Sequence, residues 1–195
     1  MAPIAADGPA ILVANHTCSA DPMFLQSALT RIPCYITSWE HYADSAFIRS
    51  VLDAMDCVPV VRNGRDTGAA LRSLRRLQQG RILIIFPEGN LSGVARNRLR
   101  AGKHGAALLA LRTRAPVYTA YIAGGPRTEK LLLSWIWPPP GHVRVIFGPA
   151  VDLSAYYDRP RTRQVLEEVT TLLLQRINAL RPTRKENGHE RNHHD

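Results

Sequence analysis

A histidine and an aspartate, His16 and Asp21, stand five positions apart in residues 15–21, NHTCSAD. A carboxylate that accepts a hydrogen bond from one imidazole nitrogen leaves the other nitrogen to take a proton from a hydroxyl. The pair could therefore act as a general base and its orienting partner. On this stretch alone, a helix-capping Asp21 beside an ordinary loop histidine is an equally open interpretation. Cys18 could also be a nucleophile activated by His16, although no further residue nearby indicates a thiolate.

The flanking sequence predicts elements that would bring His16 and Asp21 together. Residues 10–14, AILVA, form an apolar run typical of a buried strand. Asp21 and Pro22 suit the N-cap and the first helical position, and they predict a helix that begins there. His16 would then follow the carboxyl end of a strand, and Asp21 would open the next helix. In α/β proteins, sites are commonly built at this edge of the sheet.

A second candidate stretch is FPEGNLS, residues 86–92, which follows the clearest buried strand of the sequence at 81–86. This strand would deliver Glu88 and Gly89 to the sheet edge that carries His16. Gly89 lets backbone approach a ligand closely. Glu88 is one of only two acidic residues in the segment 62–114, which holds twelve Arg or Lys residues. We therefore expect Glu88 to have a functional role there.

Together, the two stretches resemble the motifs of the glycerolipid acyltransferase family, of the 1-acylglycerol-3-phosphate acyltransferase type. Those motifs are N-H-x-S-x-x-D, an arginine block, F-P-E-G-T-R-S and a proline-containing strand. The resemblance runs from about Pro9 to Leu153 and implies a single α/β domain with a central mixed β-sheet flanked by helices, as in glycerol-3-phosphate acyltransferases. We expect this domain to span residues 1–180 and to be followed by a disordered tail, 181–195.

The resemblance also implies a reaction. A fatty acyl group would move from acyl-CoA or acyl carrier protein to the hydroxyl of a lysophospholipid such as 1-acylglycerol-3-phosphate. His16 would be the general base, and Asp21 would fix its tautomer and stabilise the imidazolium. The hydroxyl would attack the thioester directly, so neither a cofactor nor a metal is expected.

Four residues are candidates for holding the acceptor. Arg62 matches the family arginine proposed to bind the acceptor phosphate, and Glu88 and Gly89 match the residues that help to position the acceptor. Lys103 lies in a lysine-glycine-alanine run like that of the family, at a predicted helix start that would suit an anionic group. Leu91 departs from the pattern, because the family has an arginine at that position.

Charge indicates the kind of partner. The chain of 195 residues has a net charge of +9, and its segment 62–114 alone carries +10. Such a field attracts anionic lipid surfaces, nucleic acid, or phosphorylated and coenzyme-A substrates. With no apolar run long enough to span a bilayer and no signal-peptide pattern, we expect a cytoplasmic protein, peripheral on the inner face of the membrane. We expect an anionic membrane surface as partner and no nucleic acid.

Two alternatives stay open. Leu91 suggests an acyltransferase of the same family with another acceptor, such as an aminolipid. The basic segment and the short stretch before His16 suggest a catalytically silent protein that binds anionic membranes or nucleic acid. The presence of both His16 and Asp21 argues against a catalytically silent protein, because a protein that only binds needs neither residue.

Hydrophobic periodicity predicts the remaining elements. The helix that Asp66 would cap is expected to bury Ala70, Leu71, Leu74 and Leu77, and to end near Gly80. Further strands are predicted at 33–37, 58–61, 115–124 and 142–149, and further helices within 39–55, from about 100 to 111, and over 162–180.

Overall fold

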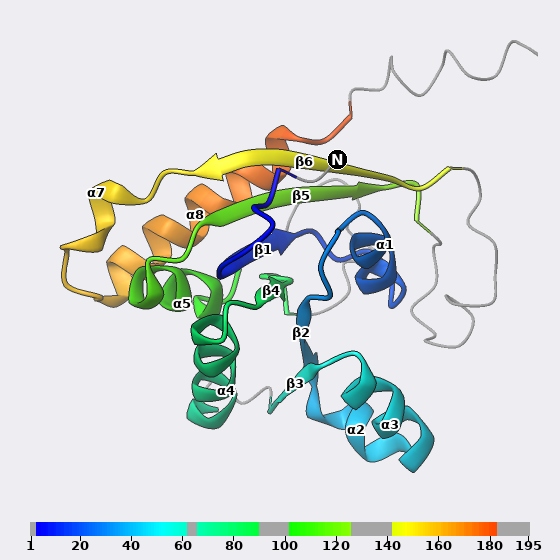
Figure 1. Cartoon of the computed structure of the whole chain (residues 1–195). Helices are drawn as coiled ribbons and strands as arrows, with labels where there is room; N and C mark the ends of the chain where they lie inside the picture. Colours follow the sequence, from blue (N-terminus) through cyan, green and yellow to red (C-terminus); the bar gives the residue numbers. More distant parts are fainter. Residues whose placement is uncertain (1–2, 62–65, 90–101, 126–141, 183–195) are drawn as a thin grey trace, which may run out of the picture.

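A six-stranded β-sheet lies at the centre of the computed structural model, which describes residues 3–61, 66–89, 102–125 and 142–182 (Figure 1). The strand order is β3-β2-β4-β1-β5-β6. The first five strands run parallel, and β6 pairs antiparallel with β5, so the sheet is mixed as predicted. The strands are β1 (Ala10–Ala14), β2 (Cys34–Ser38), β3 (Cys57–Val60), β4 (Ile82–Ile85), β5 (Val117–Ala123) and β6 (Arg144–Val151).

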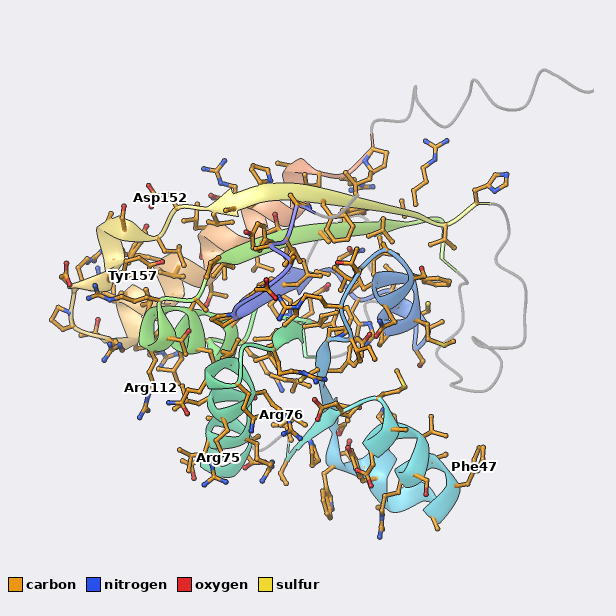
Figure 2. The ribbon with its side chains drawn as sticks, in the orientation of Figure 1. Phe47, Arg75, Arg76, Arg112, Asp152 and Tyr157 are labelled. Atoms are coloured by element: carbon orange, nitrogen blue, oxygen red, sulfur yellow. The ribbon has the colours of Figure 1, made fainter. Side chains whose placement is uncertain are left out.

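Helices cover both faces of the sheet, and Figure 2 shows the side chains of these elements in the orientation of Figure 1. On one face, α5 and α8 pack on β1, β4 and β5 through a cluster that includes Ile11, Val13 and Val169. On the other face, Leu25 of α1 packs against Leu12 and its neighbours. All five residues of β1 are buried, as expected for a central parallel strand that lies between two layers. The helices are α1 (Asp21–Ser27), α2 (Trp39–Asp44), α3 (Ala46–Ala54), α4 (Thr67–Gln78), α5 (Gly105–Thr113), α7 (Ser154–Tyr157) and α8 (Arg163–Ala179).

The buried face of α4 agrees only in part with the predicted one, since Leu77 is buried and Leu74 packs against the core. Asp66 caps the helix as predicted, since its side chain accepts a hydrogen bond from the Ala69 N–H. The buried residues are Ala69, Ser73 and Leu77, whereas Leu71 is 50% exposed. The buried residues are therefore spaced four apart. The packing of α4 against β3, β4 and α5 determines which of its faces is buried.

The parallel strands deliver three segments to one edge of the sheet. In the pairings that flank β1, Val13 lies opposite Ile85 of β4, and Ala14 lies opposite Ala120 of β5. The residues that follow β1 and β4 therefore leave the sheet side by side, and the last residues of β5 run beside the loop that follows β1. This arrangement brings the stretch around His16 next to the stretch around Glu88.

Within the described ranges, no helix is both long enough and apolar enough to cross a bilayer. The last helix among the described residues, α8, ends at Ala179, and the domain limit at residue 180 stays a prediction. The predicted tail lies outside the described residues from position 183 onward.

Candidate active site

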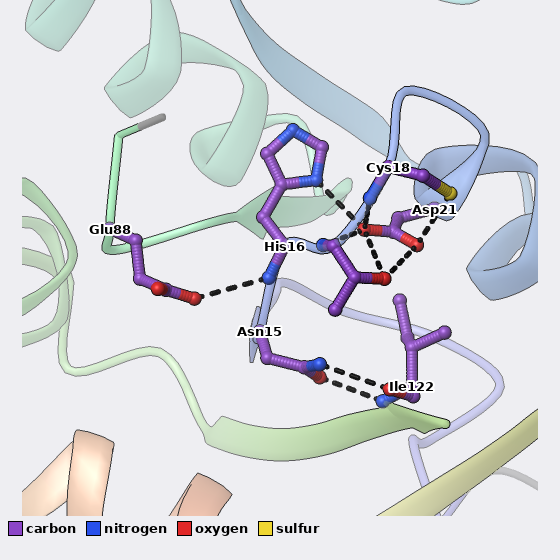
Figure 3. A network of polar contacts seen from close by, with 7 residues as sticks. Asn15, His16, Cys18, Asp21, Glu88 and Ile122 are labelled. Atoms are coloured by element: carbon purple, nitrogen blue, oxygen red, sulfur yellow. Dashed lines mark hydrogen bonds and ion pairs between the residues drawn. The ribbon is translucent and has the colours of Figure 1, made fainter. Parts of the chain in front are cut away.

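His16 and Asp21 meet at the carboxyl edge of the sheet (Figure 3). The Nδ1 atom of His16 lies 2.9 Å from Oδ2 of Asp21. The Asp21 side chain is fully buried, whereas the His16 side chain is 19% exposed. With Asp21 ionised, this contact places the imidazole proton on Nδ1 and gives Nε2 the role of proton acceptor. The histidine can therefore act as a base on a group that arrives from solvent.

Asp21 does not cap helix α1, contrary to the prediction. The N-cap is Ala20, and Asp21 is the first helical residue. Its carboxylate points back into the loop, where Oδ2 accepts hydrogen bonds from the backbone N–H groups of Thr17 and Cys18. The loop between β1 and α1 is so tight that its amides converge on the carboxylate. Such donors offset the cost of burying the carboxylate.

The second oxygen of the same carboxylate faces two side-chain donors. Thr17 Oγ1 and Cys18 Sγ each lie 3.2 Å from Oδ1 of Asp21. Burial, together with the negative charge of Asp21, raises the pKa of the Cys18 thiol to about 12. The thiol is therefore protonated at neutral pH, and this site does not support the alternative of a Cys18 nucleophile.

Two residues that follow β4 also contact His16. The His16 ring stacks on Phe86, with 4.1 Å between the ring centroids and an interplanar angle of 16°. The backbone N–H of His16 donates to Oε1 of Glu88 over 3.2 Å. The structure thus brings the two sequence stretches into direct contact, as the sheet prediction requires.

Asn15 connects the loop to the neighbouring strand β5 through two hydrogen bonds. Its side-chain amide donates to the carbonyl of Ile122 over 3.0 Å, and its Oδ1 accepts from the Ile122 N–H over 2.7 Å. The side chain therefore replaces a backbone partner where β1 ends. Both bonds are buried, which fixes the position from which the chain turns to His16 (Figure 3).

Gly89 and Lys103 lie against each other. Gly89 has a φ of +67°, and a Cβ atom built on it would lie 2.6 Å from Cε and 3.1 Å from Nζ of Lys103. The Lys103 backbone N–H also donates to the carbonyl of Pro87 over 2.7 Å. Three of the four predicted acceptor-binding residues, Glu88, Gly89 and Lys103, are therefore neighbours. The fourth, Arg62, lies outside the described residues.

Two residues of the site were not predicted. Phe86 supplies the ring under His16, and Thr17 supplies a hydroxyl to Asp21. Phe86 directly precedes the Pro-Glu-Gly turn, so its position in the motif could have indicated that it lies in the site. No feature of the sequence indicated Thr17. In the part of the chain that the structure describes, no cluster of His, Cys, Asp or Glu has the arrangement of a metal site.

The chain resembles known proteins in both sequence and fold. A model of the family "Acyltransferase" matches residues 2–123. A search of curated protein sequences finds no match. Among solved structures, the chain is similar to the 1-acyl-sn-glycerophosphate (LPA) acyltransferase PlsC from Thermotoga maritima, with a TM-score of 0.62 and 19% identity. The match covers 92% of this chain and 70% of that protein. The expected fold, a single domain with a mixed sheet flanked by helices, is therefore confirmed, and the chain belongs to the Acyltransferase family.

Proposed function

We propose that this protein transfers a fatty acyl group from a thioester, acyl-CoA or acyl carrier protein, to the hydroxyl of a lysophospholipid such as 1-acylglycerol-3-phosphate. The observation that carries this proposal is the 2.9 Å contact between Nδ1 of His16 and a fully buried Asp21 carboxylate. The other ring nitrogen is then the atom that can deprotonate an acceptor hydroxyl. The family membership and the similarity of the fold to PlsC support the same reaction class.

The proposed reaction is a single displacement at the thioester carbonyl. Nε2 of His16 takes the hydroxyl proton as the acceptor oxygen forms its bond to the carbonyl carbon. The carbon–sulfur bond then breaks, and the leaving thiolate takes the proton from the imidazolium. Asp21 stabilises that imidazolium through Nδ1. General-base assistance of this kind contributes roughly 10²- to 10⁴-fold in rate, and positioning of the two substrates supplies the rest.

We assign the acceptor headgroup to the neighbourhood of Glu88, Gly89 and Lys103. Lys103 supplies a cation beside the positive-φ turn at Gly89, and a cation suits the phosphate of a lysophospholipid. Arg62 is proposed as a second cation on the basis of its match to the family arginine. Glu88 contacts the backbone of His16, so it is placed to link acceptor binding to the base.

An anionic membrane surface is the proposed partner, and no nucleic acid is expected. The net charge of +9 favours a negatively charged surface, and the proposed acceptor is itself a membrane lipid. We propose a cytoplasmic protein that is peripheral on the inner face of the membrane. Flotation with anionic and with neutral vesicles tests this part of the proposal.

The decisive experiment measures thiol release from acyl-CoA by the purified protein, with lysophosphatidic acid supplied in detergent micelles. We expect release that depends on the acceptor and falls by roughly 10²- to 10⁴-fold in His16→Ala. His142→Ala, which changes an exposed histidine, is the matched control. Release that persists at full rate in His16→Ala contradicts the role of His16. Acyl carrier protein replaces acyl-CoA in a parallel series, since the donor is part of the proposal.

The acceptor itself has a second candidate. Leu91 replaces an arginine of the family motif, which favours a less anionic acceptor such as an aminolipid. The same assay with lysolipids that differ only in headgroup compares the two acceptors directly. If no acceptor supports thiol release while anionic vesicles or nucleic acid are bound, the catalytically silent protein is the better interpretation.

A further inference from the structure

Asp21 has two oxygens with different neighbours. Oδ2 receives Nδ1 of His16 and the backbone N–H groups of Thr17 and Cys18. Oδ1 receives two side-chain donors, the Cys18 thiol and the Thr17 hydroxyl, each at 3.2 Å, and the Thr17 hydroxyl also lies 3.4 Å from Oδ2. The backbone donors do not depend on the side chains at positions 17 and 18, whereas the donors to Oδ1 do.

We propose that the Thr17 hydroxyl and the Cys18 thiol are a positioning pair, which holds Oδ1 of Asp21 so that Oδ2 stays on Nδ1 of His16. A carboxylate can rotate about its bond to Cβ, and rotation would carry Oδ2 away from the imidazole. Two donors on Oδ1 oppose that rotation. This inference rests on the proposed function, because His16 must be the base for its orientation to affect the rate.

The environment of Cys18 supports a hydrogen-bond donor in preference to a reactive group. The residue is fully buried, and its Sγ atom faces a carboxylate that repels a thiolate. Gly125 lies beside this part of the loop, since a Cβ atom on it would be in van der Waals contact, at 3.4 to 3.8 Å, with Thr17 Oγ1, Cys18 Sγ and Asp21 Oδ1. Cys18 and Asp21 are both fully buried, and the thiol is directed at the carboxylate.

Position 18 is a serine in the motif N-H-x-S-x-x-D that the sequence resembles, and a cysteine here. Serine and cysteine share their shape, and each carries one donor at the same place. A cysteine-to-serine exchange therefore keeps the proposed hydrogen bond, whereas a cysteine-to-alanine exchange removes it.

Cys34 provides a matched control. It is also fully buried, and its Sγ atom lies 2.8 Å from Oδ2 of Asp56, so it makes the same type of contact. It is the first residue of β2 and lies at the amino end of the sheet, opposite the His16 edge. Cys34→Ala therefore removes a buried thiol and its bond to a carboxylate without touching the site.

The test compares Cys18→Ala, Cys18→Ser and Cys34→Ala by thermal unfolding and by steady-state kinetics in the thiol-release assay. We expect Cys18→Ala to lower kcat about tenfold with KM for the acceptor unchanged, as loss of a hydrogen bond to a charged positioning group would do. Cys18→Ser is expected to recover kcat to within about threefold of the unmodified protein. Cys34→Ala is expected to lower the unfolding temperature and leave kcat unchanged.

Thr17→Val and Thr17→Ser repeat the comparison on the other donor, and they keep the inference testable if Cys18→Ala fails to fold. Valine keeps the shape of threonine but removes the hydroxyl, so we expect Thr17→Val to lower kcat. Thr17→Ser keeps the hydroxyl, so we expect it to keep kcat. Equal kcat for the donor and non-donor variants at both positions overturns the inference while leaving the proposed function intact. Absence of acceptor-dependent thiol release in the unmodified protein overturns the proposed function itself.

Discussion

The backbone N–H of His16 donates to the carboxylate of Glu88, over 3.2 Å, and this bond joins two loops that are seventy-two residues apart in sequence. The two loops leave neighbouring parallel strands, β1 and β4, at the same edge. His16 is therefore held by its own loop through Asp21 and by the neighbouring loop through Glu88. The base is fixed in both its ring and its backbone.

Replacement of Asp21 by asparagine tests the orientation of the base. An amide can occupy the same space, but it does not stabilise an imidazolium and can turn an N–H toward Nδ1. We expect kcat to fall roughly 10³- to 10⁴-fold with little change in KM for the acceptor. Asp158→Asn is the control, because its carboxylate is 88% exposed and pairs with Arg114. A loss below about tenfold contradicts the role of Asp21.

Glu88 is expected to act both through its charge and through the hydrogen bond that it accepts from the His16 N–H. Two substitutions separate these roles. Glu88→Gln keeps an oxygen that accepts the His16 N–H but removes the charge, whereas Glu88→Ala removes both. We expect Ala to lower kcat about tenfold more than Gln does, because only Ala frees the His16 backbone. Steady-state kinetics measure both, with Glu167→Gln on the exposed face of α8 as the control. Equal losses in kcat would show that the charge, and not the hydrogen bond, is what matters.

The sequence predicted that His16, Asp21 and Glu88 would lie at one sheet edge, because an apolar strand precedes each of the two loop motifs, and the family resemblance implied the mixed sheet. It did not predict that Ala20, and not Asp21, is the N-cap of α1. The N-cap preference of aspartate is a local property, and here the convergence of loop amides on the carboxylate overrides it. Periodicity was only partly right about the buried face of α4, since Leu77 is buried as predicted, whereas Leu71 is 50% exposed and Ser73 is buried. That face is decided by the packing partners, which a helical pattern does not specify.

Asn15 is expected to contribute to stability as well as to the site. Asn15→Leu keeps a similar volume but leaves both the N–H and the carbonyl of Ile122 buried without their present partner. We expect the free energy of unfolding to fall by about 2–3 kcal/mol. Urea unfolding measures the change, and Asn178→Leu on the exposed side of α8 is the control. A change as small as that of the control would show that water satisfies Ile122.

Gly89 is expected to position Lys103. Gly89→Ala places a methyl group where Cε of Lys103 lies, so the lysine must move. We expect KM for an anionic acceptor to rise about tenfold, as loss of one charge-assisted contact would cause. Gly8→Ala is the control for backbone strain, because Gly8 also has a positive φ, of +83°, and its added Cβ would meet nothing within 4 Å. In a Lys103→Ala background, Gly89→Ala should have little further effect on KM. A full effect there would mean that the turn itself binds the acceptor.

The three cysteines are expected to be unreactive in the folded protein and to lower its stability in alkali. Burial is the largest cause that raises the pKa of Cys18 and Cys57 to about 12, and that of Cys34 to about 11, from 9.0. A raised folded-state pKa stabilises the protein fully below the unfolded value and loses that effect as pH rises through the folded value. The urea midpoint should therefore decline from about pH 9 upward. At neutral pH, iodoacetamide should modify the folded chain far more slowly than the chain unfolded in urea, since few thiolates form and both Cys18 and Cys34 are buried. Rapid modification of Cys18 in the folded state would show a thiolate, which cannot donate to Asp21, and would also contradict its role as a positioning residue.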